Sequence, residues 1–152
     1  MLNIPKDLRE FVELLNSNGV RYLIAGGYAV AFHGHPRMTG DIDVFVEISA
    51  ENAGRIEKVL AEFGLSSLGL AAKDFLEPRT IVQLGYPPNR IDVLTSLTGV
   101  DFEQAWAHRV GVVVDGLPIL FVGREDLIAN KRATGRPKDL ADVDALSKSK
   151  DR

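Results

Sequence analysis

The chain has 152 residues, of which 45% are hydrophobic and 26% charged, the composition of an ordinary globular domain. It contains no cysteine, which excludes disulfides and thiolate metal sites, and its formal net charge of −3 argues against indiscriminate binding of nucleic acid. A charged N-terminus and the lack of any apolar run near the roughly 20 residues that span a bilayer predict a cytoplasmic protein without a membrane partner. We expect a single domain over residues 1–152.

The N-terminal part of the chain predicts alternating helices and strands. Apolar residues at helical spacing, stopped by Asn18-Gly19, indicate a first helix, and Ser49 is a suitable cap for a later one. The predicted order is a helix over 5–19, a buried strand over 20–27, a brief helix over 28–34, a loop over 35–40, a strand over 41–48 and a helix over 50–64.

The C-terminal part predicts two hairpins and three helices, after a middle region with the weakest pattern of the chain. Strands over 79–86 and 89–96 are joined by prolines, a short helix covers 101–109, "DG" marks a hairpin within 110–122, and helices over 123–135 and 136–149 meet at Gly135. The fold class is therefore mixed α/β (α+β), with a sheet flanked by helices and two helices at the C-terminus. The order of the middle strands stays open.

Two aspartates of the segment "DIDVFVEI" are the first candidate site residues. Residues two apart in a strand share a face, so Asp41 and Asp43 project together. Two unit charges 4 Å apart repel by about 4 kcal/mol at an effective dielectric near 20. Water relieves that repulsion on a solvated sheet face, and Mg²⁺, which prefers carboxylate oxygens, relieves it in a metal site. Both alternatives are open for this pair.

Asp92 is the third acid, in the predicted strand "NRIDVLTS". An unpaired buried charge is too costly for a core, so this carboxylate belongs on a wet face or in a site. If its strand lies beside that of Asp41 and Asp43, three carboxylates meet. That set suits two divalent ions about 3.5–4 Å apart, the arrangement used for in-line phosphoryl or nucleotidyl transfer.

A glycine pair, Gly26-Gly27, ends the strand over 20–27. Glycine lets a backbone approach a ligand closely, and a helix N-terminus favours anions such as phosphate. The alternative is an ordinary tight turn. The segment has neither "GK[ST]" nor "GxGxxG", so it is not a Walker A loop or a dinucleotide fingerprint.

The block "GGYAVAFHGHPRMTGDIDVFV", with a later strand acid, resembles the first motifs of the DNA polymerase β-like nucleotidyltransferase superfamily. It is most similar to the small bacterial branch of AbiEii toxin-like and minimal nucleotidyltransferases. The tail "DLIANKRATGRPKDLADVDAL" is similar to the C-terminal motif of that branch, so the resemblance covers about residues 23–146. In place of the serine often found after the first glycine, this chain has Gly27, as in the toxin-like branch.

The resemblance implies a role for each matching residue. The glycine turn would hold the triphosphate, the acids would bind metal and catalyse transfer, and Lys131 would neutralise triphosphate charge. Arg37 and Arg136 are candidate phosphate contacts, since arginine binds phosphate oxygens bidentately. Their alternatives are a solvated loop arginine for Arg37, a helix C-terminal cation for Lys131, and a surface basic cluster for Arg136. The full set is Asp41, Asp43 and Asp92 as catalytic and metal-binding residues, with Gly26, Gly27, Arg37, Lys131 and Arg136 as nucleotide-binding residues.

The function implied is transfer of an NMP from an NTP, such as ATP, to an acceptor hydroxyl, with two Mg²⁺ ions or Mn²⁺ in their place. The toxin-like resemblance implies a tRNA 3′ end or a protein hydroxyl as acceptor, and an antitoxin protein as partner. The alternative is a noncatalytic nucleotide-binding regulatory subunit of the same fold. His33 and His35 make a poor zinc set without cysteine, and Tyr28 either stacks on a base or packs the short helix.

Overall fold

The structure, a computed structural model, describes residues 2–35 and 39–148 and contains one six-stranded mixed sheet in the order β3-β4-β2-β1-β6-β5. β1 pairs antiparallel with β2 and parallel with β6, while β2 pairs parallel with β4. The two predicted hairpins, β3–β4 and β5–β6, form the two ends of the sheet. The strands are β1 (Tyr22–Ala25), β2 (Ile42–Val46), β3 (Ile81–Leu84), β4 (Ile91–Leu94), β5 (Val110–Val114) and β6 (Leu117–Phe121).

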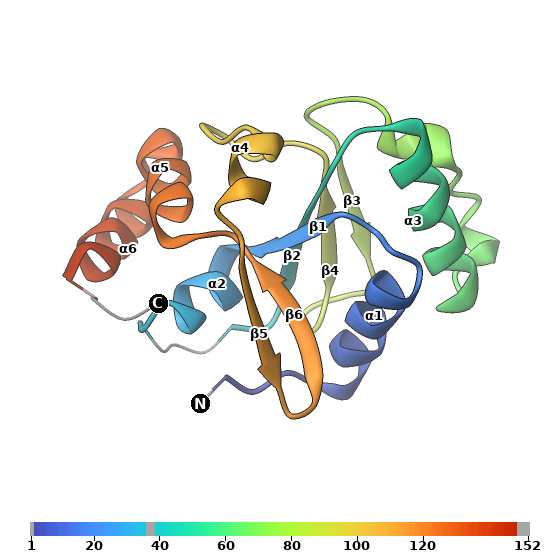
Figure 1. Cartoon of the computed structure of the whole chain (residues 1–152), viewed down its shortest axis with the longest axis horizontal. Coiled ribbons are helices and arrows are strands. Elements are labelled where there is room, and N and C mark those ends of the chain that lie inside the picture. The colour runs from blue at the N-terminus through green and yellow to red at the C-terminus, as the bar shows by residue number, and fades with distance from the viewer. Residues whose placement is uncertain (1, 36–38, 149–152) are drawn as a thin grey trace.

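Helices cover the sheet on two sides, with α2, α5 and α6 to its left and α1 and α3 to its right in Figure 1. α2 packs on β1 and β2 and also touches α5, which pairs with α6, and α1 packs against α3. The helices are α1 (Lys6–Ser17), α2 (Gly26–Phe32), α3 (Ala50–Glu62), α4 (Phe102–Ala107), α5 (Arg124–Thr134) and α6 (Pro137–Lys148), with short 3₁₀ turns η1 (Ser66–Leu68) and η2 (Ala72–Phe75).

The central strands owe their place to their sequence pattern. All four residues of β1 are buried, because a strand between two neighbours and under helices on both faces has no wet side. The outer strand β5 instead alternates between half-buried and exposed residues. The core therefore lies around β1 and β2, and the end of β1 and the start of β2 lie next to α2.

The mixed α+β fold class is confirmed, including the sheet and the two C-terminal helices. Ser49 caps α3 by accepting a 3.1 Å hydrogen bond from the Asn52 N–H, and Gly135 joins α5 to α6 with φ of +64°. None of the helices in the described part of the chain is both long enough and apolar enough to cross a membrane.

Two boundaries that affect the site differ from the prediction. The short helix begins at Gly26 rather than Tyr28, and β2 begins at Ile42, so Asp41 precedes the strand instead of lying within it. The 3₁₀ turns η1 and η2 were not predicted, because such short turns leave no periodic apolar pattern to detect.

Candidate active site

The glycine turn and the first acids are in direct contact. β1 and β2 pair so that Ala25 lies opposite Asp43, which brings the next residue, Gly26, against the Asp43 side chain. A Cβ atom at Gly26 would lie 2.0 Å from Asp43 Oδ2, and Gly26 has φ of +63°, where side chains are strained. A side chain at this position would force the Asp43 carboxylate to move. Gly27 follows as the second residue of α2.

The three acids are brought together by the order of the strands. β2 and β4 are parallel neighbours in a register that pairs Asp43 with Asp92, so both side chains lie on the same face. Asp41 lies immediately before β2, and its charge and that of Asp92 both act on Asp43. The carboxylates from the two segments therefore form one cluster beside the glycine turn.

Arg90 completes this cluster, and sequence reasoning missed it. Its Nε donates a 2.7 Å hydrogen bond to Asp92 Oδ1, and its Nη2 donates one of 3.0 Å to Asp92 Oδ2. The same Nη2 lies 3.3 Å from Asp41 Oδ2, while the backbone N–H of Arg90 donates to Asp41 Oδ1 at 3.1 Å. The signal was present in "RID", since residues two apart along a strand share a face. One guanidinium therefore bridges two of the three acids.

The backbone explains why Arg90 and Asp41 meet. The Ile42 N–H donates a 2.9 Å hydrogen bond to the Arg90 carbonyl, which extends the β2–β4 pairing by one step. Just before it, a Cβ at Gly40 would lie 2.0 Å from the Pro88 carbonyl oxygen, so the approach to β2 runs tightly along the β3–β4 turn. The segments that precede β2 and β4 are therefore held against each other where they contribute to the acid cluster.

The pKa of Asp43 is raised from 3.8 to about 6, first by burial and then by the nearby charges of Asp92 and Asp41. Lys131 and Arg90 act in the opposite direction. At neutral pH the carboxyl group is therefore mostly ionised although its surroundings disfavour the charge. A cation bound at this point would relieve that unfavourable interaction.

This raised pKa predicts a pH-dependent stability in metal-free buffer. A carboxyl group whose folded pKa lies above its unfolded pKa stabilises the fold below the unfolded value and loses that contribution as pH rises through the folded value. With values of 3.8 and about 6, Asp43 destabilises the wild type relative to Asp43→Asn by about 2 kcal/mol more at pH 7.5 than at pH 4.5. Urea unfolding of both proteins at both pH values, in EDTA, measures this difference. A difference between the two proteins that is independent of pH would contradict the raised pKa.

Lys131 lies in a second cluster, formed with two acids of α6. Its Nζ is 3.2 Å from Asp142 Oδ2 and 3.5 Å from Asp139 Oδ1, and all three residues are buried. Thr134 Oγ1 donates to Asp139 at 2.8 Å, and Arg136 Nε does so at 2.7 Å. These donors, Arg136 foremost, hold the pKa of Asp139 far below its usual range.

Lys131 is thus more than a helix C-terminal cation, because it forms ion pairs with two buried acids of α6. The Lys131 charge also lowers the pKa of Asp43, so the two clusters are electrostatically adjacent. Its ion pairs nevertheless run to α6. The role of Lys131 toward a triphosphate stays a prediction.

Replacing Lys131 by methionine is expected to destabilise the fold by about 3 kcal/mol, because it removes one ion-pair partner from each of the buried carboxylates of Asp139 and Asp142. The matched control is Lys148→Met, which removes an exposed lysine paired with Asp144 and should change the free energy of unfolding by less than about 0.5 kcal/mol. Urea unfolding checks both. Equal effects for the two variants would show that the buried cluster contributes no more to the free energy of unfolding than an exposed ion pair does.

The structure does not place the other two predicted phosphate contacts, Arg37 and Arg136, in the acid cluster. Arg37 lies outside the described residues. The Arg136 side chain is 70% exposed and bound to Asp139, and its backbone N–H also donates to Asp139. The structure brings together Gly26, Asp41, Asp43 and Asp92, while Arg136 is held by the α6 acid.

Comparison with known proteins identifies the family of this chain. Residues 3–150 match the model of a family described as "Nucleotidyltransferase of unknown function (DUF6036)". The chain belongs to this family. Membership assigns it to the nucleotidyltransferases, a class of transferase enzymes, and confirms the superfamily that the motifs resemble. No curated protein matches the sequence.

Solved structures of nucleotidyltransferases share the fold. A candidate nucleotidyltransferase from Thermotoga maritima has a TM-score of 0.59 at 16% identity, over 94% of this chain and 91% of that one. A nucleotidyltransferase-like antigenic protein from Paracoccidioides brasiliensis gives 0.56 at 16%, over 91% of this chain and 72% of that one. The lincosamide antibiotic adenylyltransferase LnuA, bound to lincomycin, gives 0.57 at 14%, over 99% of this chain and all of that one, 100%. At these identities the likeness shows the fold alone.

The side chains of this nucleotidyltransferase fit a hard divalent cation only in part. Asp41 and Asp43 offer carboxylate oxygens, the donors that Mg²⁺ and Mn²⁺ prefer. Both oxygens of Asp92 already accept hydrogen bonds from Arg90. Among residues 2–35 and 39–148, no group of three or more His, Asp or Glu side chains is arranged to hold a metal ion. A three-carboxylate site requires that Arg90 move.

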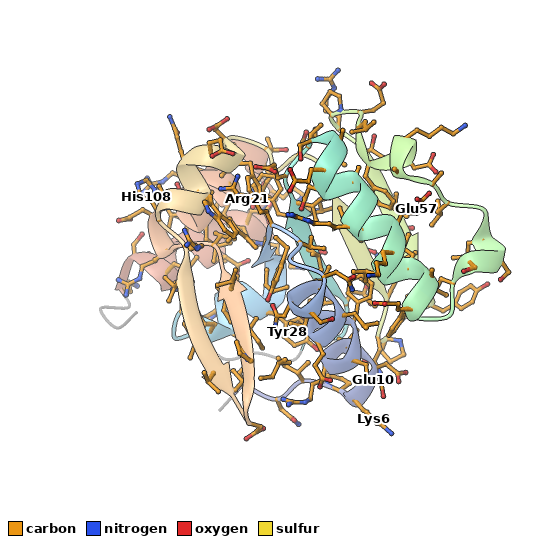
Figure 2. The ribbon with its side chains drawn as sticks, turned by 45° about the vertical axis from the view of Figure 1, so that its right-hand side comes forward. Lys6, Glu10, Arg21, Tyr28, Glu57 and His108 are labelled. Carbon is orange, nitrogen blue, oxygen red and sulfur yellow. The ribbon has the colours of Figure 1, made fainter. Side chains whose placement is uncertain are left out.

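Tyr28 has a buried hydroxyl group in the electrostatic neighbourhood of the acid cluster. This tyrosine on α2, labelled in Figure 2, is 1% exposed, and its hydroxyl has no hydrogen-bond partner among the described residues. Burial raises its pKa, and the charge of Asp41 adds to the effect, so Asp41 is an electrostatic neighbour. A buried donor left without a partner is rare, and a ligand oxygen or a water would satisfy it. His33, in contrast, contacts the Val122 carbonyl oxygen at 2.8 Å through Nε2, a structural link.

Proposed function

We propose that this protein transfers an NMP group from an NTP to an acceptor hydroxyl at the cluster of Asp41, Asp43 and Asp92. The observation that carries the proposal is the contact between Gly26 and Asp43, together with the register that pairs Asp43 with Asp92. It supports a site where phosphates on the glycine turn lie next to clustered carboxylates. Membership of a nucleotidyltransferase family supports the same reaction class.

Each group has a defined task in this reaction. The backbone N–H groups of Gly26 and Gly27 receive the triphosphate, since the lack of side chains lets phosphate oxygens approach the main chain. The acceptor oxygen attacks the α-phosphorus, a new P–O bond forms, and the bond to the bridging oxygen breaks to release pyrophosphate. Asp92 accepts the proton of the acceptor hydroxyl. Positioning and charge neutralisation supply most of the rate enhancement in such transfers.

The carboxylates would hold a divalent cation, with Mg²⁺ proposed and Mn²⁺ as the substitute. When bound, such an ion neutralises phosphate charge and polarises the reacting oxygens. Asp43 is the proposed ligand that makes no ion pair with Arg90, and Asp41 and Asp92 join it when the guanidinium moves. Lys131, Arg136 and Arg37 remain proposed phosphate contacts.

The acceptor is proposed from the toxin-like resemblance, as a tRNA 3′ end or a protein hydroxyl, in the cytoplasm and with an antitoxin as partner. The comparisons identify the nucleotidyltransferase class and not this branch. LnuA, which shares the fold, is a lincosamide antibiotic adenylyltransferase, so a small-molecule hydroxyl is the competing acceptor.

The test begins with binding and then measures transfer. Thermal unfolding with each NTP, with and without Mg²⁺, should show a stabilisation that requires both. Each α-labelled NTP is then incubated with total tRNA, total protein and lincomycin, and label transfer that stops in EDTA identifies the acceptor. Absence of any nucleotide-dependent stabilisation would refute the proposed function.

A second candidate is a noncatalytic nucleotide-binding regulatory subunit, and one observation favours it. Arg90 occupies both oxygens of Asp92, which is where a catalytic metal would bind. This function predicts NTP binding without any turnover and without dependence on a metal. Metal-dependent label transfer would exclude it.

A further inference from the structure

The acid cluster is already neutralised by a cation of its own. Arg90 contacts two of the three carboxylates through its guanidinium group, at 2.7 and 3.0 Å to Asp92 and 3.3 Å to Asp41. The pair with Asp92 uses two parallel N–H groups on two oxygens, the strong bidentate geometry between arginine and carboxylate. A divalent cation entering this cluster therefore competes with a well-placed guanidinium.

The other nearby cation does not share this role. The Nζ of Lys131 is held by Asp139 and Asp142, and it influences Asp43 only as a charge at a distance. Arg90 is thus the cation that contacts the acid cluster within the described residues. Removal of its guanidinium would leave three carboxylates close together, while its presence leaves Asp92 without a free oxygen for a metal.

Arg90 is also placed to change partners. It lies immediately before β4, at the end of the β3–β4 turn, and its side chain is 25% exposed rather than enclosed. Through the cluster it is on the same side of the sheet as the Gly26 turn, where a triphosphate would lie. Phosphate oxygens accept the same bidentate pair of N–H groups that Asp92 now accepts.

We propose that Arg90 is an internal counterion that keeps a divalent cation out of the acid cluster until a nucleotide triphosphate takes its guanidinium in exchange. Metal and nucleotide then bind together rather than one after the other. The inference rests on the proposed function, because it assumes that the glycine turn receives a triphosphate. It assigns Arg90 a positioning role that none of the sequence motifs assigned.

The experiment measures Mn²⁺ affinity by electron paramagnetic resonance, with and without a nonhydrolysable ATP analogue, for the wild type, Arg90→Gln and Arg90→Lys. In the wild type, Mn²⁺ alone should bind weakly, and the analogue should raise its affinity at least about tenfold. Arg90→Gln should bind Mn²⁺ alone at least about tenfold more tightly, and the analogue should then add little. Arg90→Lys, which keeps the charge and loses the two-pronged contact, should lie between them.

Each contrary result identifies a different error. Unchanged Mn²⁺ affinity in Arg90→Gln, or unchanged enhancement by the analogue, would overturn the counterion role. If Arg90→Lys bound Mn²⁺ with the affinity of the wild type, a positive charge alone would be enough to weaken metal binding. That result would also overturn the proposed role of the bidentate contact. If the wild type bound neither the analogue nor Mn²⁺ with it, the proposed function itself would fail.

A matched variant and a second readout protect the test against misfolding. Arg55→Gln removes an exposed arginine paired with Glu51 on α3 and should leave Mn²⁺ affinity within about twofold of the wild type, as expected for a screened surface charge. Arg90→Gln should have a lower melting temperature than the wild type in EDTA, and Mn²⁺ should restore it. The inference would be contradicted if Mn²⁺ raised the melting temperature of Arg90→Gln by no more than it raises that of the wild type.

Discussion

Replacing Asp43 by asparagine is expected to reduce nucleotidyl transfer by about 10³-fold or more while making the metal-free protein more stable. The carboxylate lies at the centre of the cluster, against Gly26 and opposite Asp92, so its charge would be required wherever phosphate and cation meet. That same charge is unfavourable in the resting protein, since burial and two neighbouring acids raise the pKa of Asp43 to about 6. Asparagine removes the repulsion and keeps the shape.

The two readouts are steady-state label transfer with saturating NTP and Mg²⁺, and urea unfolding at pH 7.5 in EDTA. The opposite directions matter, because a variant that is inactive and more stable has not lost activity through misfolding. The matched control is Asp115→Asn, at the β5–β6 turn, where Asn-Gly suits a hairpin turn as well as Asp-Gly does. Asp43→Asn with full activity would remove this residue from the site.

Gly26→Ala is expected to lower transfer by more than about 100-fold, because its Cβ would displace the Asp43 carboxylate. The added atom would lie 2.0 Å from Asp43 Oδ2 and 2.8 Å from its Cγ, so the side chain must move. Misplacement of a reacting group by about 1 Å is enough to cost about 100-fold in rate. The positive φ of +63° adds a strain of about 1 kcal/mol to the fold.

Gly19→Ala separates these two effects. Gly19 has nearly the same φ, +67°, but a Cβ there meets no atom within 4 Å. Both variants should therefore lose a similar backbone contribution to stability, while Gly19→Ala keeps wild-type transfer. Transfer rates and urea unfolding of the two variants make the comparison. Equal loss of activity in both variants would mean that strain alone, and not the contact with Asp43, explains the effect.

Much of this site could be predicted from the local sequence pattern, because the glycine turn and the first two aspartates are close in sequence. Period-two alternation placed Asp41 and Asp43 together, and the glycines at the end of an apolar strand marked the turn beside them. The position of Asp92 needed more. Whether β4 lies next to β2 depends on a parallel pairing between segments about 50 residues apart, and no local signal encodes that neighbour.

The contacts that were not predicted from the sequence have a common physical origin. Arg90, Asp139 and Asp142 are charged residues, and a charged residue in a sequence is most simply assigned to solvent. In the fold the two α6 aspartates are buried because Lys131 of α5 reaches them, and Arg90 is bound because the β2–β4 pairing delivers Asp41 to its backbone and side chain. Such partners become visible only when distant segments are placed side by side.

Crystallisation of the protein with Mn²⁺ and a nonhydrolysable NTP analogue, with anomalous scattering to locate the metal, tests the central claim most directly. The account predicts Mn²⁺ on the carboxylates of Asp41 and Asp43, triphosphate oxygens against the main chain of Gly26 and Gly27, and Arg90 moved from Asp92 to a phosphate. Mn²⁺ or triphosphate bound elsewhere on the molecule, with these carboxylates unoccupied, would contradict it.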